Sequence, residues 1–295
     1  MGNLCANSTF VDPDEIPAKW HEFGELEDIG WAANAIGGAY EIIKYSRIFD
    51  DQRLNAIGIS VLHHALEGGF IQDDGFVRPY RDISSDKRFI NYMHNPKFEN
   101  WFCPGSTGYI ALQLLWASDE VQEPLRSRLR ETALLVSDWL WENVTPCPNG
   151  WYPRRCTPDG SHANYKAWGD YPDDQCDHSG DGTYLLWLWV ELSKRGLRDY
   201  KKEIRRAAEI YRNIGGAFGN INHDTYDDCE NVALSVGYRC LSRAADYLND
   251  NGLREWKERS HSRRGGVLWR HDVYPTVSKQ HVHYRSNLVL SGESG

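Results

Sequence analysis

Three stretches of the chain are apolar on nearly every side of a helix. They read AANAIGGAYEII, IALQLLWA and LLWLWVEL. Helices that are apolar all round lie inside a protein, so we predict three buried helices. A fourth buried helix, NVALSVGYRCLSRAADYL, is predicted after the acidic run Asp227-Asp228-Cys229-Glu230.

Each buried stretch is followed by an amphipathic one. Residues 50–67, 123–142 and 199–213 repeat apolar side chains at a period near 3.6, with polar residues opposite, which predicts outer helices. A fourth outer helix, less well defined, is expected to start near Asn251. The apolar positions of the first three are Leu54, Ile57, Val61, Leu62, Ala65, Leu125, Leu129, Ala133, Val136, Leu140, Tyr200, Ile204, Ala207, Ala208 and Tyr211.

The first three buried helices start alike, which indicates an internal repeat. Their starts read Asp28-Ile29-Gly30-Trp31, Ser106-Thr107-Gly108-Tyr109 and Asp181-Gly182-Thr183-Tyr184. Repeated helical hairpins with the apolar helices inside predict an all-α fold, an (α/α) toroid with inner and outer rings. The inner helices of a toroid are parallel, so the long loops before them, 68–105 and 145–180, should gather at one end. Long structured loops in a compact domain are usually functional.

The predicted organisation has three parts: an N-terminal segment (1–25), the toroid domain (26–260) and an irregular tail (261–295) without helical period. About four hairpins can be counted, against the six of a closed barrel. Two explanations stay open: the chain is incomplete relative to a six-hairpin barrel, or its tail packs irregularly.

Charge and composition narrow the class of partner. The net charge is −9 without a basic block, which argues against nucleic-acid binding. No stretch reaches the roughly 20 apolar residues of a membrane helix, and the start MGNLCANSTF does not resemble a secretory signal. We therefore expect a cytoplasmic protein without membrane contact. Its seven cysteines are then expected to be free thiols. The sequons at Asn7 and Asn143 carry little weight, because a cytoplasmic chain is not N-glycosylated. No C-x-x-C motif occurs, so no metal site is predicted.

The aromatic content suggests a sugar ligand. Twelve Trp and sixteen Tyr combine flat apolar faces with polar edges, which suits stacking on sugar rings, although a Trp-rich core is the alternative for any one of them. Two arginine pairs, Arg78/Arg81 and Arg154/Arg155, could bind carboxylates bidentately, so an acidic oligosaccharide is the expected substrate. The alternative is that these arginines pair with nearby surface Asp. The candidate binding residues are Trp31, Arg78, Tyr80, Arg81, Trp101, Trp151, Arg154, Arg155 and Tyr184.

Two acidic clusters precede buried helices and carry the candidate chemistry. The first comprises His223, Asp224, Tyr226, Asp227 and Glu230. Asp227 with Glu230 could instead form a capping box, because acids favour helix starts.

The second cluster holds Asp181 and His178. We predict that Asp181 is a general acid and that His178 helps set its protonation, with an N-cap role for Asp181 as the alternative. Two carboxylates facing each other are the minimum for glycoside hydrolysis, and the second would come from residues 223–230. His and Tyr beside carboxylates could instead act in a lyase or an epimerase.

At these residues the chain resembles the six-hairpin glycosidase superfamily, which includes unsaturated glucuronyl hydrolases and related uronic-acid glycosidases and lyases. The resemblance rests on the repeated helix starts and on the segments DHSGDGTYLLWLW and INHDTYDDCENVAL, and it covers roughly Leu26 to Leu248. It implies a hydrolase or lyase of polysaccharide fragments without a redox cofactor. A non-catalytic glycan-binding or scaffold protein is the alternative.

Overall fold

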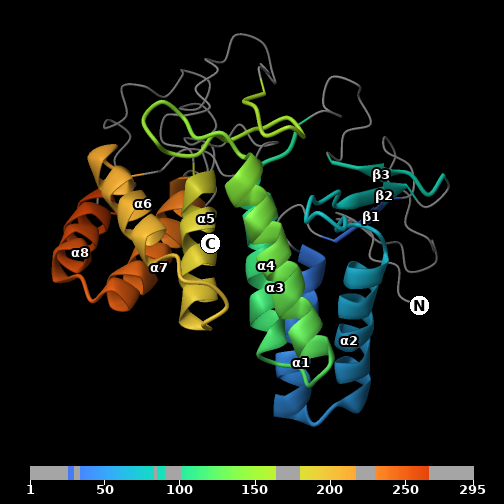
Figure 1. Cartoon of the computed structure of the whole chain (residues 1–295). Helices are drawn as coiled ribbons and strands as arrows, with labels where there is room; N and C mark the ends of the chain where they lie inside the picture. The colour runs from blue at the N-terminus through green and yellow to red at the C-terminus, as the bar shows by residue number, and fades with distance from the viewer. Residues whose placement is uncertain are drawn as a thin grey trace, which may run out of the picture.

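The computed structural model describes residues 26–29, 34–82, 85–90, 101–163, 180–216 and 230–265. Within these ranges eight helices dominate, so the all-α prediction is confirmed (Figure 1). The helices are α1 (Asn34–Phe49), α2 (Gln52–Glu67), α3 (Pro104–Ser118), α4 (Leu125–Asn143), α5 (Asp181–Lys194), α6 (Lys201–Asn213), α7 (Glu230–Leu248) and α8 (Asn251–Gly265).

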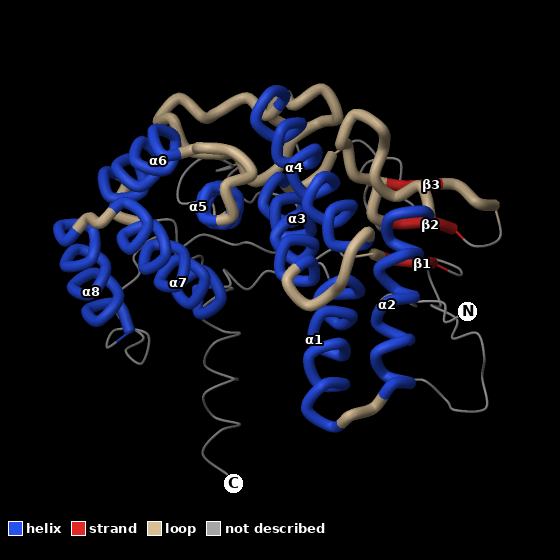
Figure 2. The backbone as a smooth tube through the Cα atoms, turned by 60° about the horizontal axis from the view of Figure 1, so that its bottom comes forward, coloured by secondary structure: helices blue, strands red, loops and turns tan. Residues whose placement is uncertain are grey.

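The helices form four consecutive hairpins in two layers. The odd-numbered helices pack side by side, α1 on α3, α3 on α5 and α5 on α7, and each carries its even-numbered partner on the other side. The hairpins follow one another in a curved row (Figure 2). This is the inner and outer arrangement that the repeat predicts.

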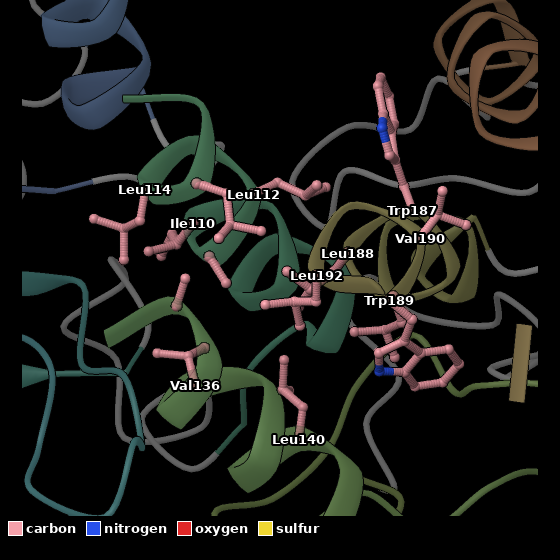
Figure 3. Close-up of a cluster of buried hydrophobic side chains, with 14 of the residues drawn as sticks. Ile110, Leu112, Leu114, Val136, Leu140, Trp187, Leu188, Trp189, Val190 and Leu192 are labelled. Atoms are coloured by element: carbon pink, nitrogen blue, oxygen red, sulfur yellow. The ribbon is translucent and has the colours of Figure 1, made fainter. Parts of the chain in front are cut away.

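The burial of each helix follows its sequence pattern. Residues 110–115 of α3 are buried all round, because this inner helix packs between α1, α4 and α5. The outer helices bury one face each, and the predicted faces of α4 and α6 are confirmed. Figure 3 shows the centre of this core, where α3, α4 and α5 interdigitate. In α2 the prediction is wrong for Ile57, which is 44% exposed, because the core side of that helix is Val61, Leu62 and Ala65.

The two ends of the array differ in their connections. At one end, which we call the short-loop end, a few residues join each inner helix to its outer partner. At the other, the long-loop end, residues 68–103, 144–180 and 214–229 connect one hairpin to the next. Asp181 at the start of α5 touches Gly105 at the start of α3, and Arg195 after α5 meets Asp119 after α3. These two inner helices are therefore parallel, and their starts lie at the long-loop end, as predicted.

The repeat does not predict a small antiparallel sheet that lies beside the first hairpin at the long-loop end. It consists of β1 (Leu26–Asp28), β2 (Tyr80–Asp82) and β3 (Arg88–Phe89) in that order, with Asp28 opposite Tyr80 and Tyr80 opposite Phe89. At the other terminus, α8 continues to Gly265, into the segment 261–295 that was expected to be irregular. The pattern therefore places the end of this helix a few residues too early, and helix ends are the least certain part of such a prediction.

Candidate functional site

The described residues cover about half of the predicted site. His178, His223, Asp224, Tyr226, Asp227 and Trp31 lie outside them. Glu230 is the first residue of α7, and its side chain is also outside the description. The acidic cluster before α7 therefore stays a prediction.

Asp181 is the first residue of α5 and is fully buried. Its Oδ1 accepts a hydrogen bond of 2.8 Å from the backbone N–H of Gly105, in the first turn of α3. The N-cap position of its own helix is Gly180. The first N–H groups of a helix lack partners within the helix and favour a negative charge, so Asp181 caps the neighbouring helix rather than its own. Its role as a general acid remains a prediction.

The starts of the inner helices are packed at backbone distance. A Cβ added to Gly105 would lie 2.5 Å from the Cα of Asp181, and one added to Gly182 would lie 2.5 Å from Cε2 of Trp151. The close neighbour of Gly182 is thus a core side chain. Trp151 is fully buried, with its ring 5.6 Å from that of Tyr211, so its prediction as a stacking platform for sugar is wrong.

Two other predicted aromatic platforms are also buried. Tyr80 on β2 is 1% exposed, and Trp101 is 3% exposed in a small cluster with Cys103 and Ala163. The guanidinium of Arg155 lies 5.3 Å from the centre of the Trp101 ring. Rings this deeply covered offer no face to a ligand, so both are corrected to core residues. The physical reason is that the loops of the long-loop end bury aromatic side chains of their own.

The predicted arginines have local partners or lie at the surface. Arg81 is half-buried with its guanidinium 3.4 Å from the carboxylate of Asp86, which is the surface-pair alternative. Arg78 is exposed, and Arg154 is half-buried like Arg155. One arginine of each predicted pair therefore has a local partner. Arg81 pairs with Asp86, and Arg155 packs on Trp101.

A row of aromatic side chains crosses three inner helices, and only Tyr184 in it was predicted to be functional. We call it the aromatic row: Tyr40 of α1, Tyr109 and Trp116 of α3, and Tyr184 and Trp187 of α5. The ring centres of neighbours lie 4.7 Å apart for Tyr109 and Tyr184, and 5.3 Å apart for Trp116 and Trp187. Tyr40 joins the row 6.3 Å from Trp116. All except Trp187 are only half-buried.

The aromatic row lies on the side of the inner layer that faces away from the outer helices. Trp187 and Trp189 leave α5 on opposite sides, Trp189 toward α4 and Trp187 away from it (Figure 3). Glu41 of α1 and Arg239 of α7 both act electrostatically on Tyr109, although α3 and α5 separate their helices within the layer. A charged side chain of the first inner helix and one of the last therefore both act on this face of the layer.

Partial burial of the aromatic row changes the properties of its polar groups. Burial raises the pKa of the Tyr109 hydroxyl, against the opposing hydrogen bond with Gln113. Arg243 of α7 lies over the Trp187 ring at 5.3 Å and pairs with Glu191 at 3.0 Å. The spacing of Tyr109, Gln113 and Trp116 on one helical face is a signal in the sequence, but the apolar surroundings hide it.

The four cysteines within the described ranges divide into two kinds. Cys103, Cys156 and Cys240 are buried free thiols. Burial raises the pKa of Cys156 and Cys240, and for Cys156 the nearby Asp181 raises it further. Cys147 is disulfide-bonded, so the expectation of free thiols throughout is wrong at this position. Cys103 is 4% exposed, which is typical of a packed thiol rather than a nucleophile.

Within the described ranges, no cluster of three or more His, Cys, Asp or Glu could hold a metal ion. None of the helices in these ranges is long and apolar enough to cross a bilayer.

Two comparisons with known proteins found no match. No protein-family model matches the chain. No curated protein sequence matches it significantly either.

Proposed function

We propose that the protein is an enzyme that acts on glycans, a glycoside hydrolase for oligosaccharides that contain uronic acids. The observation that carries the proposal is the aromatic row, with the arginines of α7 beside it. A sugar chain is proposed to lie across the inner helices, with its rings stacked on Tyr109 and Tyr184. The architecture and the resemblance to six-hairpin glycosidases support the same function.

The exposure of the aromatic row supports a ligand rather than a core. Trp189, on the opposite side of α5, is 2% exposed, whereas Tyr109, Trp116 and Tyr184 keep part of their surface open. Half-buried Tyr and Trp offer an apolar face together with a polar edge, which matches the C–H faces and hydroxyls of a sugar. The row therefore has both the surface and the chemistry that such a ligand needs.

The charges beside the row favour an acidic sugar. Arg243 is 44% exposed in its side chain and already packs on the ring of Trp187. A guanidinium that stacks on an aromatic ring keeps N–H donors in its plane, and these can bind a carboxylate. Arg239 on the preceding turn is exposed as well. These two residues replace Arg78 and Arg81 in the proposal because they lie beside the aromatic row. Arg243 would keep its pair with Glu191 through Nη1 and offer its remaining N–H donors to the sugar.

Hydrolysis requires two carboxylates, one acid and one base or nucleophile. The burial of Asp181 and its bond to Gly105 favour a structural role for that carboxylate. This supports a second candidate function, glycan binding without catalysis. If the protein is a hydrolase, we expect residues 223–230 to supply its acids; His and Tyr there would serve the lyase or epimerase alternative.

Calorimetry with neutral and uronic-acid oligosaccharides tests the binding part of the proposal. Tyr109→Ala and Trp116→Ala should weaken binding of the acidic set by about tenfold or more, which corresponds to about 1.4 kcal/mol. Trp141→Ala is the matched control, because Trp141 is 41% exposed on the outer helix α4. Equal losses in the control, or no loss in the row, would remove the row from the proposal.

Mass spectrometry of the incubated sugars tests the catalytic part. A hydrolase adds water to its products, a lyase leaves an unsaturated sugar, and binding without turnover supports the second candidate. Asp181→Asn should lower turnover by about 10²–10⁴-fold if Asp181 is the acid. Unchanged turnover by folded Asp181→Asn would leave this residue with its structural role alone.

A further inference from the structure

The exit of α4 carries two features that the proposed function does not use. Asn143 is the last residue of the helix and begins the sequon Asn143-Val144-Thr145. Cys147, shortly after it, is disulfide-bonded. We propose that Asn143 carries an N-linked glycan and that the chain matures in an oxidising, secretory-type compartment.

The sequon presents its two recognition residues to solvent. Asn143 and Thr145 are exposed, whereas Val144 between them is 5% exposed and extended, with φ −72° and ψ 116°. The backbone of Thr145 is held on both sides, since its N–H donates to Gly160 at 3.0 Å and its carbonyl pairs with His162 at 2.9 Å. The two polar side chains therefore project outward from a fixed backbone. N-glycosylation needs a surface acceptor of this kind, with a residue other than Pro in the middle.

The local hydrogen bonding of Asn143 is compatible with a sugar. Its Nδ2 donates to the carbonyl oxygen of Trp139 at 2.9 Å. An amide nitrogen that carries a glycan keeps one N–H, so this bond can persist after modification. The glycan would extend from the surface of the outer layer, away from the aromatic row on the inner layer.

The disulfide is the second, independent observation. Disulfides persist in oxidising compartments and are rare where thiols are kept reduced, and N-linked glycans are added to secreted chains. Cys147 lies in a tight turn, in which its N–H donates to Trp151 and its carbonyl accepts from Gly150, both at 2.8 Å. Both features thus point to one compartment, contrary to the cytoplasmic location expected from the sequence.

The free thiols of the described residues fit the same environment. Cys103, Cys156 and Cys240 are at most 4% exposed, so oxidants and other thiols cannot reach them easily. Reactivity requires an accessible thiolate. Three buried thiols beside one bonded cysteine are compatible with an oxidising compartment, whereas an exposed free thiol would not be.

The test begins with the protein isolated from its own source. Because Cys147 is 4% exposed, the protein is unfolded in denaturant before alkylation without reduction. Peptide mapping should then find Cys103, Cys156 and Cys240 labelled, Cys147 unlabelled, and a glycan on the peptide that contains Asn143. Treatment with peptide N-glycosidase should remove the glycan and convert Asn143 to Asp. An unmodified Asn143 overturns the glycan, and an alkylated Cys147 overturns the compartment.

Variants secreted from eukaryotic cells separate the sequon from folding. Asn143→Gln and Thr145→Ala should lose the glycan, whereas Thr145→Ser should keep it, because Ser also completes the sequon. Asn7→Gln as the common background removes the other sequon. A folded, secreted Thr145→Ser protein without a glycan would show that the folded surface does not accept it, and would overturn the proposal.

Discussion

The two ends of the helix array are held together by different kinds of contact. At the short-loop end, side-chain ion pairs link the hairpins. Asp119 pairs with Arg130 at 3.1 Å and with Arg195 at 2.6 Å, and Glu191 pairs with Arg195 at 2.6 Å and with Arg243 at 3.0 Å. At the long-loop end, the hairpins are linked instead by contacts to backbone groups.

The contacts at the long-loop end leave little free space. Phe102 and Cys156 exchange two backbone hydrogen bonds of 2.8 and 2.9 Å, which fix the loop of 144–163 against the start of α3. Asp181 joins α5 to the N–H of Gly105, at a site where a Cβ on Gly105 would collide. Chain segments far apart in sequence are thereby locked in position around the helix starts.

This difference indicates which end of the array tolerates less structural rearrangement. The pairs of Asp119, whose side chain is 42% exposed, contribute little to stability and tolerate rearrangement, because solvent screens them. Backbone contacts without room for a methyl group do not tolerate it. A binding site needs rigid support, so the long-loop end and the aromatic row below it are the regions where sequence changes should cost most.

Substitution of one glycine at each end gives the largest expected difference. Gly160 in the long-loop region has φ +80°, and Gly196 at the short-loop end has φ +68°, so Ala costs about 1–2 kcal/mol of backbone strain at either position. A Cβ on Gly160 would also overlap the carbonyl oxygen of Asn143, whereas one on Gly196 meets nothing within 4 Å. Gly160→Ala should therefore lose about 1–3 kcal/mol more than Gly196→Ala. Urea unfolding measures both, and equal losses would contradict the contrast between the ends.

Removal of one buried carboxylate at each end gives an intermediate effect. Asp181→Ala leaves the Gly105 N–H without its acceptor inside the protein and should cost about 1–3 kcal/mol. Glu191→Gln should cost less, because Arg195 keeps Asp119 and Arg243 is partly exposed. Added salt should shrink the second cost more than the first, because Arg243 is 44% exposed whereas Asp181 is fully buried. An equally salt-dependent loss in Asp181→Ala would mean that this contact is not shielded as its burial indicates.

The helical fold was predictable because the apolar residues of each helix repeat with a local period. The buried faces of α4 and α6 were predicted position by position, since an outer helix repeats its apolar residues every 3.6 positions. The small sheet was not, because strands of two or three residues carry no comparable period. Ile57 shows the limit within a helix, because an apolar residue at the edge of a face can remain exposed.

The candidate site was predictable only in part, because its contacts join distant parts of the chain. Asp181 was predicted to be a general acid, which stays a prediction. Its observed partner Gly105 belongs to another hairpin, so the sequence does not show this contact. Trp151 and Trp101 were interpreted as ligand platforms, since a sequence does not show whether a loop buries its own aromatic residues. The aromatic row, Tyr184 excepted, was missed for the opposite reason, because its members lie in helices that look apolar on every side.

The smallest expected effect concerns pH, again at the long-loop end. Asp159 accepts hydrogen bonds from the Thr157 hydroxyl at 2.5 Å and from the Ser161 N–H at 3.0 Å. These bonds, the Thr157 one foremost, hold the pKa of the Asp159 carboxyl below its ordinary value. Because the folded pKa is lower than the unfolded one, the ionised carboxylate stabilises the fold above the unfolded pKa of about 3.9, and this contribution is lost as the pH falls through the folded pKa.

Asp159→Asn should therefore be slightly less stable than the wild type at neutral pH, and the difference should close as the pH falls below about 4. The group is fully exposed, so the difference is expected to be small. Thr157→Val removes the foremost hydrogen bond and should raise the pKa of Asp159, which an NMR titration of that carboxyl measures directly. If the urea midpoints of wild type and Asp159→Asn differ by the same amount at all pH values, the difference does not arise from the charge. The loop would then be held by its backbone bonds, such as those between Thr157, Gly160 and Ser161.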